Sequence, residues 1–300
     1  MLDIVGKRKI YFTLSGILVG AAIVAIIVFG FKQGIDFVGG SLWKFRVPLN
    51  QPSSQELEAA FQVDLGLGEV RMNYEEGSGV FFVRLPAVNE IDHQKFLNIL
   101  RNKFPSFQEL SFESIGPSIG NELRRKAFIG VALVLLGISF YIAFAFRKTS
   151  RPVSSWKYGW ITLLTLFHDA IIPAGLFSTL GYFFKIEVDT NFIVALLVVV
   201  GFSVHDTIVV FDRIRENLTL NRGRSSFETV VNESVNQTLG RSVNTSLTLI
   251  LVLIALYITG PSNLHYFVLT LLVGVTTGIY SSIFVASPAL LLVTPKDKRI

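Results

Sequence analysis

The chain has 300 residues, and 16% of them are charged, below the roughly 25% usual in soluble domains. Hydrophobic residues make up 51%, and the absence of cysteine excludes a disulfide framework and a thiolate metal site. The net charge of +5 is not accompanied by a basic–aromatic motif, so the composition indicates a membrane protein and we expect no nucleic-acid role.

Six stretches match the length of about 20 mostly apolar residues that crosses a bilayer. They lie at 10–30, 127–146, 158–182, 190–211, 243–260 and 265–292. The first follows three basic residues, as a signal peptide does, but its apolar run is longer and no A-x-A-like cleavage site follows. We therefore interpret it as an uncleaved anchor.

The positions of lysine and arginine predict the orientation of the spans. Fifteen of them lie before the first span, between the second and third, between the fourth and fifth, and after the sixth. The short loops on the other side, around 183–189 and 260–264, contain only Lys185. Both termini are therefore expected in the cytoplasm.

The segment 31–126 between the first two spans is expected to be a folded extracytoplasmic domain. Strand and helix composition alternates along it, with strands at 41–47 and 107–115, helices at 53–63 and 90–104, and two strands around a glycine-containing turn in 69–85. The order β-α-β-β-α-β is typical of a ferredoxin-like split fold.

The sequence therefore predicts a polytopic α-helical membrane protein with six transmembrane helices and a small α+β domain. We expect an N-terminal cytoplasmic segment and first helix in 1–30, the α+β domain in 31–126, a five-helix bundle in 127–292 and a cytoplasmic tail in 293–300.

Acidic residues inside two of the spans are the leading candidates for function. Ionisable groups in spans are rare and costly, and they usually face the interior of a bundle. Asp169 follows His168 near the middle of the third span, and Asp206 lies nearer the cytoplasmic end of the fourth. Each acid also has a structural interpretation as a hydrogen-bonding residue, and His168 is equally well explained by packing.

Helical geometry groups the polar residues of the fourth span. At 100° per residue, Ser203, Asp206 and Thr207 share one helix face, and His205 lies nearly opposite. His205 is therefore interpreted as structural.

A second polar stripe is expected in the third span, where Thr162, Thr165 and Asp169 share a face. Pro173 has no N–H, so the carbonyl of Asp169 loses its helical partner. A carboxylate and a freed carbonyl at one depth are a suitable site for a proton or a water molecule.

Small residues four apart favour close contact between helices in a bundle. The two candidate sets are Ser15, Gly16 and Gly20 in the first span, and Gly274, Gly278 and Ser282 in the sixth.

Enzymatic motifs are missing from the sequence: there is no phosphate loop, HExxH or GxSxG. We therefore expect no enzymatic activity, no cofactor and no metal. A carboxylate in a span suits a different energy source, because one charge moved through 100 mV is worth about 2.3 kcal/mol.

Five motifs, in their order along the chain, resemble the SecF family of protein-export membrane subunits. They are GIDFVGGS (34–41), SIGPSIGNEL (114–123), FHDA (167–170), GFSVHDTIVVFDRIREN (201–217) and RSVNTSLT (241–248). The resemblance extends over nearly all of the chain. It implies six spans with a ferredoxin-like domain after the first, in the cytoplasmic (inner) membrane, as in the resistance-nodulation-division superfamily.

The resemblance also implies partners and a role. SecF-like proteins pair with SecD and associate with the SecYEG channel, and we expect YajC, SecA and unfolded preproteins as further partners. They use the proton motive force to draw preproteins outward late in export.

Carried over by residue, the family's proton-path acid falls on Asp169, with Asp206, Ser203 and Thr207 in support and His168 beside it. His205 stands where the family commonly has asparagine.

Two other functions stay open on the sequence. One is a small-molecule or lipid exporter half of the same superfamily, although a domain of about 95 residues leaves little room for a ligand vestibule. The other is a passive assembly factor of the translocon, for which the span acids would be dispensable. Coupling to sodium in place of protons also stays open.

Overall fold

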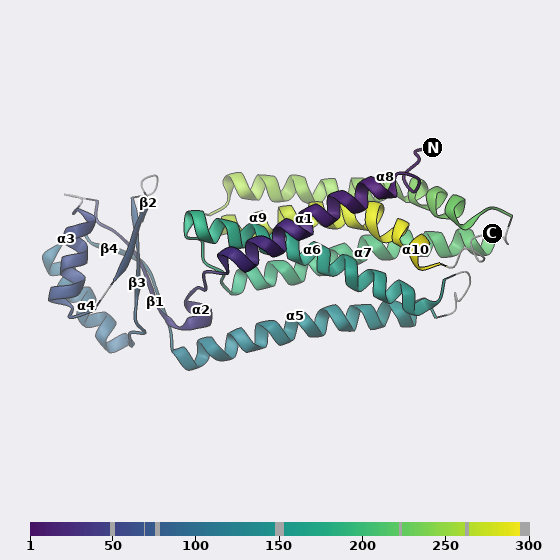
Figure 1. The fold of residues 1–300 in the computed structure, drawn as a ribbon. Coiled ribbons are helices and arrows are strands. Elements are labelled where there is room, and N and C mark those ends of the chain that lie inside the picture. The colour runs from purple at the N-terminus through teal and green to yellow at the C-terminus, as the bar shows by residue number, and fades with distance from the viewer. Residues whose placement is uncertain are drawn as a thin grey trace. The chain divides into compact units, whose positions relative to one another are not determined.

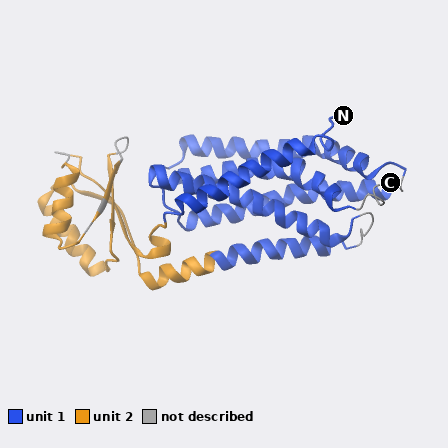
Figure 2. Ribbon diagram, viewed as in Figure 1, with its two compact units in different colours: residues 1–32, 128–300 blue, residues 33–127 orange. Residues whose placement is uncertain are grey.

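The structure is a computed structural model that describes residues 1–48, 52–68, 70–75, 79–147, 153–221, 224–261 and 264–294. It divides into two compact units, residues 33–127 and residues 1–32 with 128–300 (Figure 2). The first is called the α+β unit and the second the helical unit.

The α+β unit has the predicted order of elements, β-α-β-β-α-β. Its strands are β1 (Gly40–Arg46), β2 (Arg71–Glu75), β3 (Val80–Leu85) and β4 (Gln108–Ile115). Helix α3 (Ser54–Ala59), continued by a π-helical turn η1 (Ala60–Asp64), and helix α4 (Glu90–Lys103) connect them. The strands pair antiparallel in the order β2-β3-β1-β4, the ferredoxin-like arrangement (Figure 1). The predicted turn at 76–78 lies outside the described residues.

Capping and an aromatic core hold this unit together. Ser53 begins α3 with a reciprocal capping box to Glu56, as expected from the sequence. Trp43, on β1, is fully buried in the core against Phe112. His93 is 4% exposed, stacks on Phe112 and lies 2.7 Å from a carboxylate oxygen of Glu109. His93 is therefore a packed core residue of the α+β unit.

Two of the quoted motifs meet where the sheet joins the second span. Gly39 and Gly40, which follow the short helix α2 (Ile35–Val38), have φ angles of 78° and 123°, which favour glycine. A Cβ atom on Gly39 would lie 2.7 Å from the Cα of Pro117, and one on Gly120 would lie 2.8 Å from the nitrogen of Gly39. Side chains at these positions would force the two backbones apart.

In the part of the chain that the structure describes, six helices are long and apolar enough to cross a membrane (Figure 1). Five are continuous: α1 (Arg8–Phe29), α5 (Pro117–Ala145), α6 (Ser155–Phe184), α7 (Thr190–Asn221) and α8 (Phe227–Thr259). The sixth consists of α9 (His265–Ser281), a π-helical turn η3 (Ser282–Ala286) and α10 (Ser287–Val293). The predicted fold class is confirmed.

Helices α5, α7 and α8 extend ten or more residues beyond the apolar stretches that predict them. Helix α5 begins ten residues before the predicted span, and α7 and α8 extend into the charged segment 212–242. The segment FDRIREN is therefore the last part of α7. Arginine, glutamate and leucine are good helix formers, so a helix continues past the apolar run until a capping or breaking residue ends it.

The first residues of the chain are fastened to α8. The backbone nitrogens of Ile4 and Val5 donate to the side-chain oxygen of Asn232 at 3.0 and 3.1 Å, and that of Leu2 donates to Asn236 at 2.9 Å. Ile4 and Val5 are also buried. This segment is therefore held by both hydrogen bonds and packing.

The small residues of the sixth span pack as predicted. A Cβ atom on Gly274 would lie 2.2 Å from a methyl group of Val199, and one on Gly278 would lie 3.1 Å from the Cβ of Ser203. Helix α9 therefore packs closely against α7, because the two glycines leave room for the side chains of Val199 and Ser203.

The matching prediction for the first span is wrong for its glycines. Among the described residues, nothing lies within 4 Å of a Cβ built on Gly16 or Gly20. Helix α1 instead meets α6 through Ala22, which would lie 2.5 Å or less from a Cβ on Gly175. Ser15 and Ala22 are seven residues apart and share the buried face, whereas the glycines are rotated by more than 90° from it.

Candidate functional site

Asp169 links three spans at the centre of the helical unit. It lies on α6 and is fully buried. Ser203 of α7 and Ser281 of α9 both donate hydrogen bonds to its Oδ2 atom, the latter at 2.7 Å. The Nδ1 atom of His168 lies 2.8 Å from Oδ1. The carboxylate thus has three close polar partners from three helices.

The predicted stripe on α6 is buried, but its hydroxyl groups do not reach the acid. Thr162 donates to the carbonyl of Tyr158 at 2.9 Å, and Thr165 donates to that of Ile161 at 3.0 Å. Both threonines therefore satisfy their hydroxyls within their own helix. Pro173 lies inside the same helix, as the sequence requires.

Asp206 forms a second buried acidic site between α7 and α8. It is 2% exposed, and its Oδ2 atom accepts a hydrogen bond from Ser246 at 3.2 Å. The interpretation of Asp206 as the acid nearer to water finds no support in its burial, because Asp169 at 0% is scarcely more enclosed.

The polar face of α7 is buried as its spacing predicts, and His205 is exposed on the other side. The three residues of this face do not bind one another. Ser203 binds Asp169 of α6, Asp206 accepts from α8, and Thr207 lies 2.8 Å from the hydroxyl of Ser282. Neighbouring positions on one helix thus fasten it to three others.

Ser281, which the sequence did not single out, and Ser282, which it indicated only as a small packing residue, are polar partners of the buried groups. Ser281 binds Asp169, and the adjacent Ser282 binds Thr207 and lies 3.3 Å from the carbonyl oxygen of Ser203. They stand where α9 gives way to the π-helical turn, and such turns are frequent at functional sites. The sequence signal that indicates these two serines is a pair of adjacent hydroxyl residues inside an apolar run.

The electrostatic setting of the two acids differs. Asp169 has three polar partners, one of which, His168, can carry a positive charge. Among the described residues, Asp206 has one hydrogen-bond partner, the neutral hydroxyl of Ser246. A buried carboxylate without a cationic partner is costly when ionised, and this cost applies to Asp206.

His168 adds a second unusual feature. Its Nε2 atom is buried and has no hydrogen-bond partner among the described residues, while Nδ1 faces Asp169. Buried polar atoms normally have partners, so this ring nitrogen is an exception.

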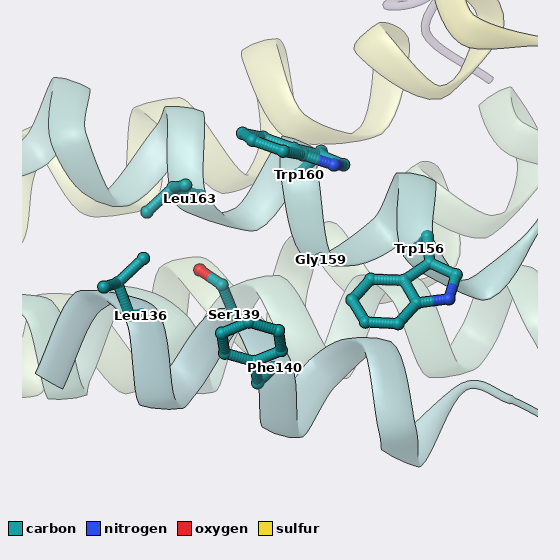
Figure 3. Close-up of a pocket in the computed structure, with 7 residues that line it drawn as sticks. All are labelled: Leu136, Ser139, Phe140, Trp156, Gly159, Trp160 and Leu163. Carbon is teal, nitrogen blue, oxygen red and sulfur yellow. The ribbon is translucent and has the colours of Figure 1, made fainter. Parts of the chain in front are cut away.

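A groove of about 180 Å³ lies between α5 and α6, apart from these acids (Figure 3). Its lining consists of Leu136, Ser139, Phe140, Trp156, Gly159, Trp160 and Leu163. The Ser139 hydroxyl donates to the carbonyl of Leu135 at 2.8 Å, so no lining side chain offers chemistry for a proton.

Comparison with known proteins decides the family. The model of the protein export membrane protein SecD/SecF C-terminal family matches residues 95–296, and the SecD/SecF GG motif matches residues 24–42. The chain belongs to the SecD/SecF family. Gly39 and Gly40 are the glycine pair within the GG motif. Their positive φ angles and close backbone contacts explain why these positions favour glycine.

Relatives in the SecD/SecF family extend along the whole chain. The protein translocase subunit SecF of Thermobaculum terrenum is 43% identical, over 99% of this chain and 95% of that protein. The SecF of Haemophilus influenzae is 35% identical, over 93% of this chain and 82% of that protein. The predicted resemblance is confirmed.

A solved structure shares the fold. The crystal structure of SecDF, a translocon-associated membrane protein from Thermus thermophilus, is 34% identical with a TM-score of 0.80. The match covers 97% of this chain but only 38% of that chain, so this SecF-family chain spans well under half the length of that relative.

Proposed function

We propose that this SecF-family chain uses the proton motive force to promote late-stage protein export across the cytoplasmic membrane. The observation that carries the proposal is the pair of enclosed carboxylates, Asp169 and Asp206, each held between helices of the bundle. Ionisable groups at such positions mark proton relays in membrane proteins. Ser203 and His168 position Asp169, and Thr207 connects α7 to the sixth span through Ser282.

Partners follow from the family and from the unpaired surfaces of the bundle. Most of the SecDF chain lies outside the match. We propose that a separate SecD-like subunit supplies the part that this chain does not cover. Only 11% of the most apolar window of α1 and 17% of that of α5 is buried within the chain, which leaves apolar helix faces available. We assign the SecYEG channel, SecA, YajC and unfolded preproteins to the wider assembly.

The deciding experiment measures late-stage translocation into sealed membrane vesicles with and without an imposed proton gradient. Vesicles that contain the chain are expected to show a gradient-dependent increase in export, and vesicles without it none. A sodium gradient imposed in the same way is expected to have no effect. Equal stimulation with the chain present or absent would support a passive assembly factor.

The orientation has a separate test, which the absence of native cysteine makes clean. Val63, in the α+β unit, is 79% exposed, and Leu220, near the end of α7, is 69% exposed. Val63→Cys should react with an impermeant thiol reagent that is added to cells after the envelope layers outside the cytoplasmic membrane have been removed. Leu220→Cys should react only after the membrane is opened. Labelling of Leu220→Cys from outside would reverse the orientation.

Six of the basic residues behind this orientation lie outside the described residues. They are Lys148, Arg151, Arg222, Lys296, Lys298 and Arg299.

A further inference from the structure

Four buried hydroxyl side chains lie four residues apart on α8. They are Ser234, Thr238, Ser242 and Ser246, with exposures of 0%, 7%, 1% and 0%. Residues four apart occupy the same helix face, so these hydroxyls form a single row, called here the hydroxyl row.

Both ends of the hydroxyl row contact α7. At one end, Ser246 donates to the carboxylate of Asp206 at 3.2 Å. At the other end, the Nδ2 atom of Asn217 donates to the Ser234 hydroxyl at 2.8 Å. Asn217 also donates to the exposed Gln237 at 2.9 Å. The row thus begins at a buried acid and ends, about 18 Å further along the helix, beside polar groups at the surface.

The middle of the row contains an unsatisfied hydroxyl. Ser234 and Thr238 donate to carbonyl groups of α8 itself, at 2.7 and 3.0 Å. Ser242 is also buried, but its Oγ atom has no hydrogen-bond partner in the part of the chain that the structure describes. Buried hydroxyls are normally paired, and one without a partner costs free energy. A polar molecule that fills this position would remove the cost.

Water is the molecule whose size fits the spacing. Hydroxyls four residues apart are separated by about 6 Å along the helix axis, which is too far for a direct O–H···O bond. One water between two such hydroxyls can bond to both. Val210 and Ile214 lie on α7 between Asp206 and Asn217, and both are fully buried and apolar. Between those two contacts, the polar groups therefore come from the hydroxyl row of α8.

We propose that water molecules join the hydroxyl row into a proton wire from Asp206 to the cytoplasmic end of α7 and α8. This wire rests on the proposed function and names its route. A proton that leaves the carboxyl group of Asp206 passes to the nearest oxygen of the row. Each hydroxyl or water then takes up one proton and releases another. The carboxylate is restored, the row is unchanged, and one proton reaches the water beside Asn217.

The test compares two isosteric replacements of the unsatisfied hydroxyl in the full chain within its native membrane assembly. Ser242→Val removes the hydroxyl, whereas Ser242→Thr adds the same volume and keeps it. The gradient-dependent part of export should fall about tenfold in Ser242→Val and change by less than about twofold in Ser242→Thr. Export without the gradient should be the same in both. Thr245→Val is the matched control, because Thr245 is an exposed hydroxyl on the same helix.

Equal behaviour of the valine and threonine variants would overturn the wire. If both keep the gradient effect, the hydroxyl is not needed, and if both lose it, volume and not hydrogen bonding is responsible. Asp206→Asn in the same vesicles separates the two levels of the argument. If Asp206→Asn keeps the full gradient effect, the wire fails at its first group, whereas the proposed function fails only if vesicles with the unaltered chain show no gradient effect. If Asp206→Asn loses it while the two Ser242 variants agree, only the wire fails.

Discussion

Asp169→Asn should abolish gradient-dependent export while the bundle stays assembled. Asparagine keeps the size of the side chain and an oxygen that accepts from Ser203 and Ser281, but it has no carboxylate to protonate. The loss should be about a hundredfold or more, the usual effect of removing a positioned proton-transfer group. The measurement is translocation into sealed vesicles with and without an imposed proton gradient.

Two further variants show whether charge or packing is responsible. Asp169→Leu removes every acceptor and leaves the partner hydroxyls buried and unpaired, at about 1–3 kcal/mol each, so it should lower the thermal stability of the purified protein. Asp212→Asn should be silent, because Asp212 forms an exposed pair with Arg215. Full gradient-dependent export by Asp169→Asn would exclude this residue from the proton path.

Asp206→Asn should also lower gradient-dependent export about a hundredfold. Ser246, its hydroxyl partner among the described residues, donates to the side-chain oxygen, and asparagine keeps that acceptor. Assembly and thermal stability should therefore be close to normal, and only the gradient-dependent part of export should disappear.

The adjacent residue provides the control for Asp206. His205→Asn changes an exposed side chain on the opposite face of α7 and should leave export unchanged. A silent Asp206→Asn together with an inactive His205→Asn would show that the exposed face of the helix, and not the buried one, carries the function.

The helices and the buried faces could be predicted because their signals are local. Apolar runs of sufficient length mark the spans, and the 100° rotation per residue separates Asp206 from His205 without any tertiary information. The α+β unit follows from the same periodicities. Helix ends beyond the apolar runs were less predictable, because the composition of the amphipathic segment 212–221 is compatible with both a loop and a helix.

The partners of the acids could not be predicted because they are distant in sequence. Ser281 is 112 residues from Asp169, and Ser246 is 40 residues from Asp206. No local periodicity connects such pairs. The glycines of the first span show the opposite failure. Gly16 and Gly20 have the spacing of a contact motif, but the side of α1 that packs on α6 depends on neighbours that the motif does not specify.

The hydrogen bonds between the start of the chain and α8 impose an order on biosynthesis. Ile4 leaves the ribosome 228 residues before its partner Asn232. At about 5–20 residues per second, translation takes roughly 11–46 seconds to close that interval. Throughout this time Ile4 and Val5 are without the packing that buries them in the finished bundle. The first helix is therefore made long before its partner residues on α8 exist, and α8 completes the attachment of the first residues.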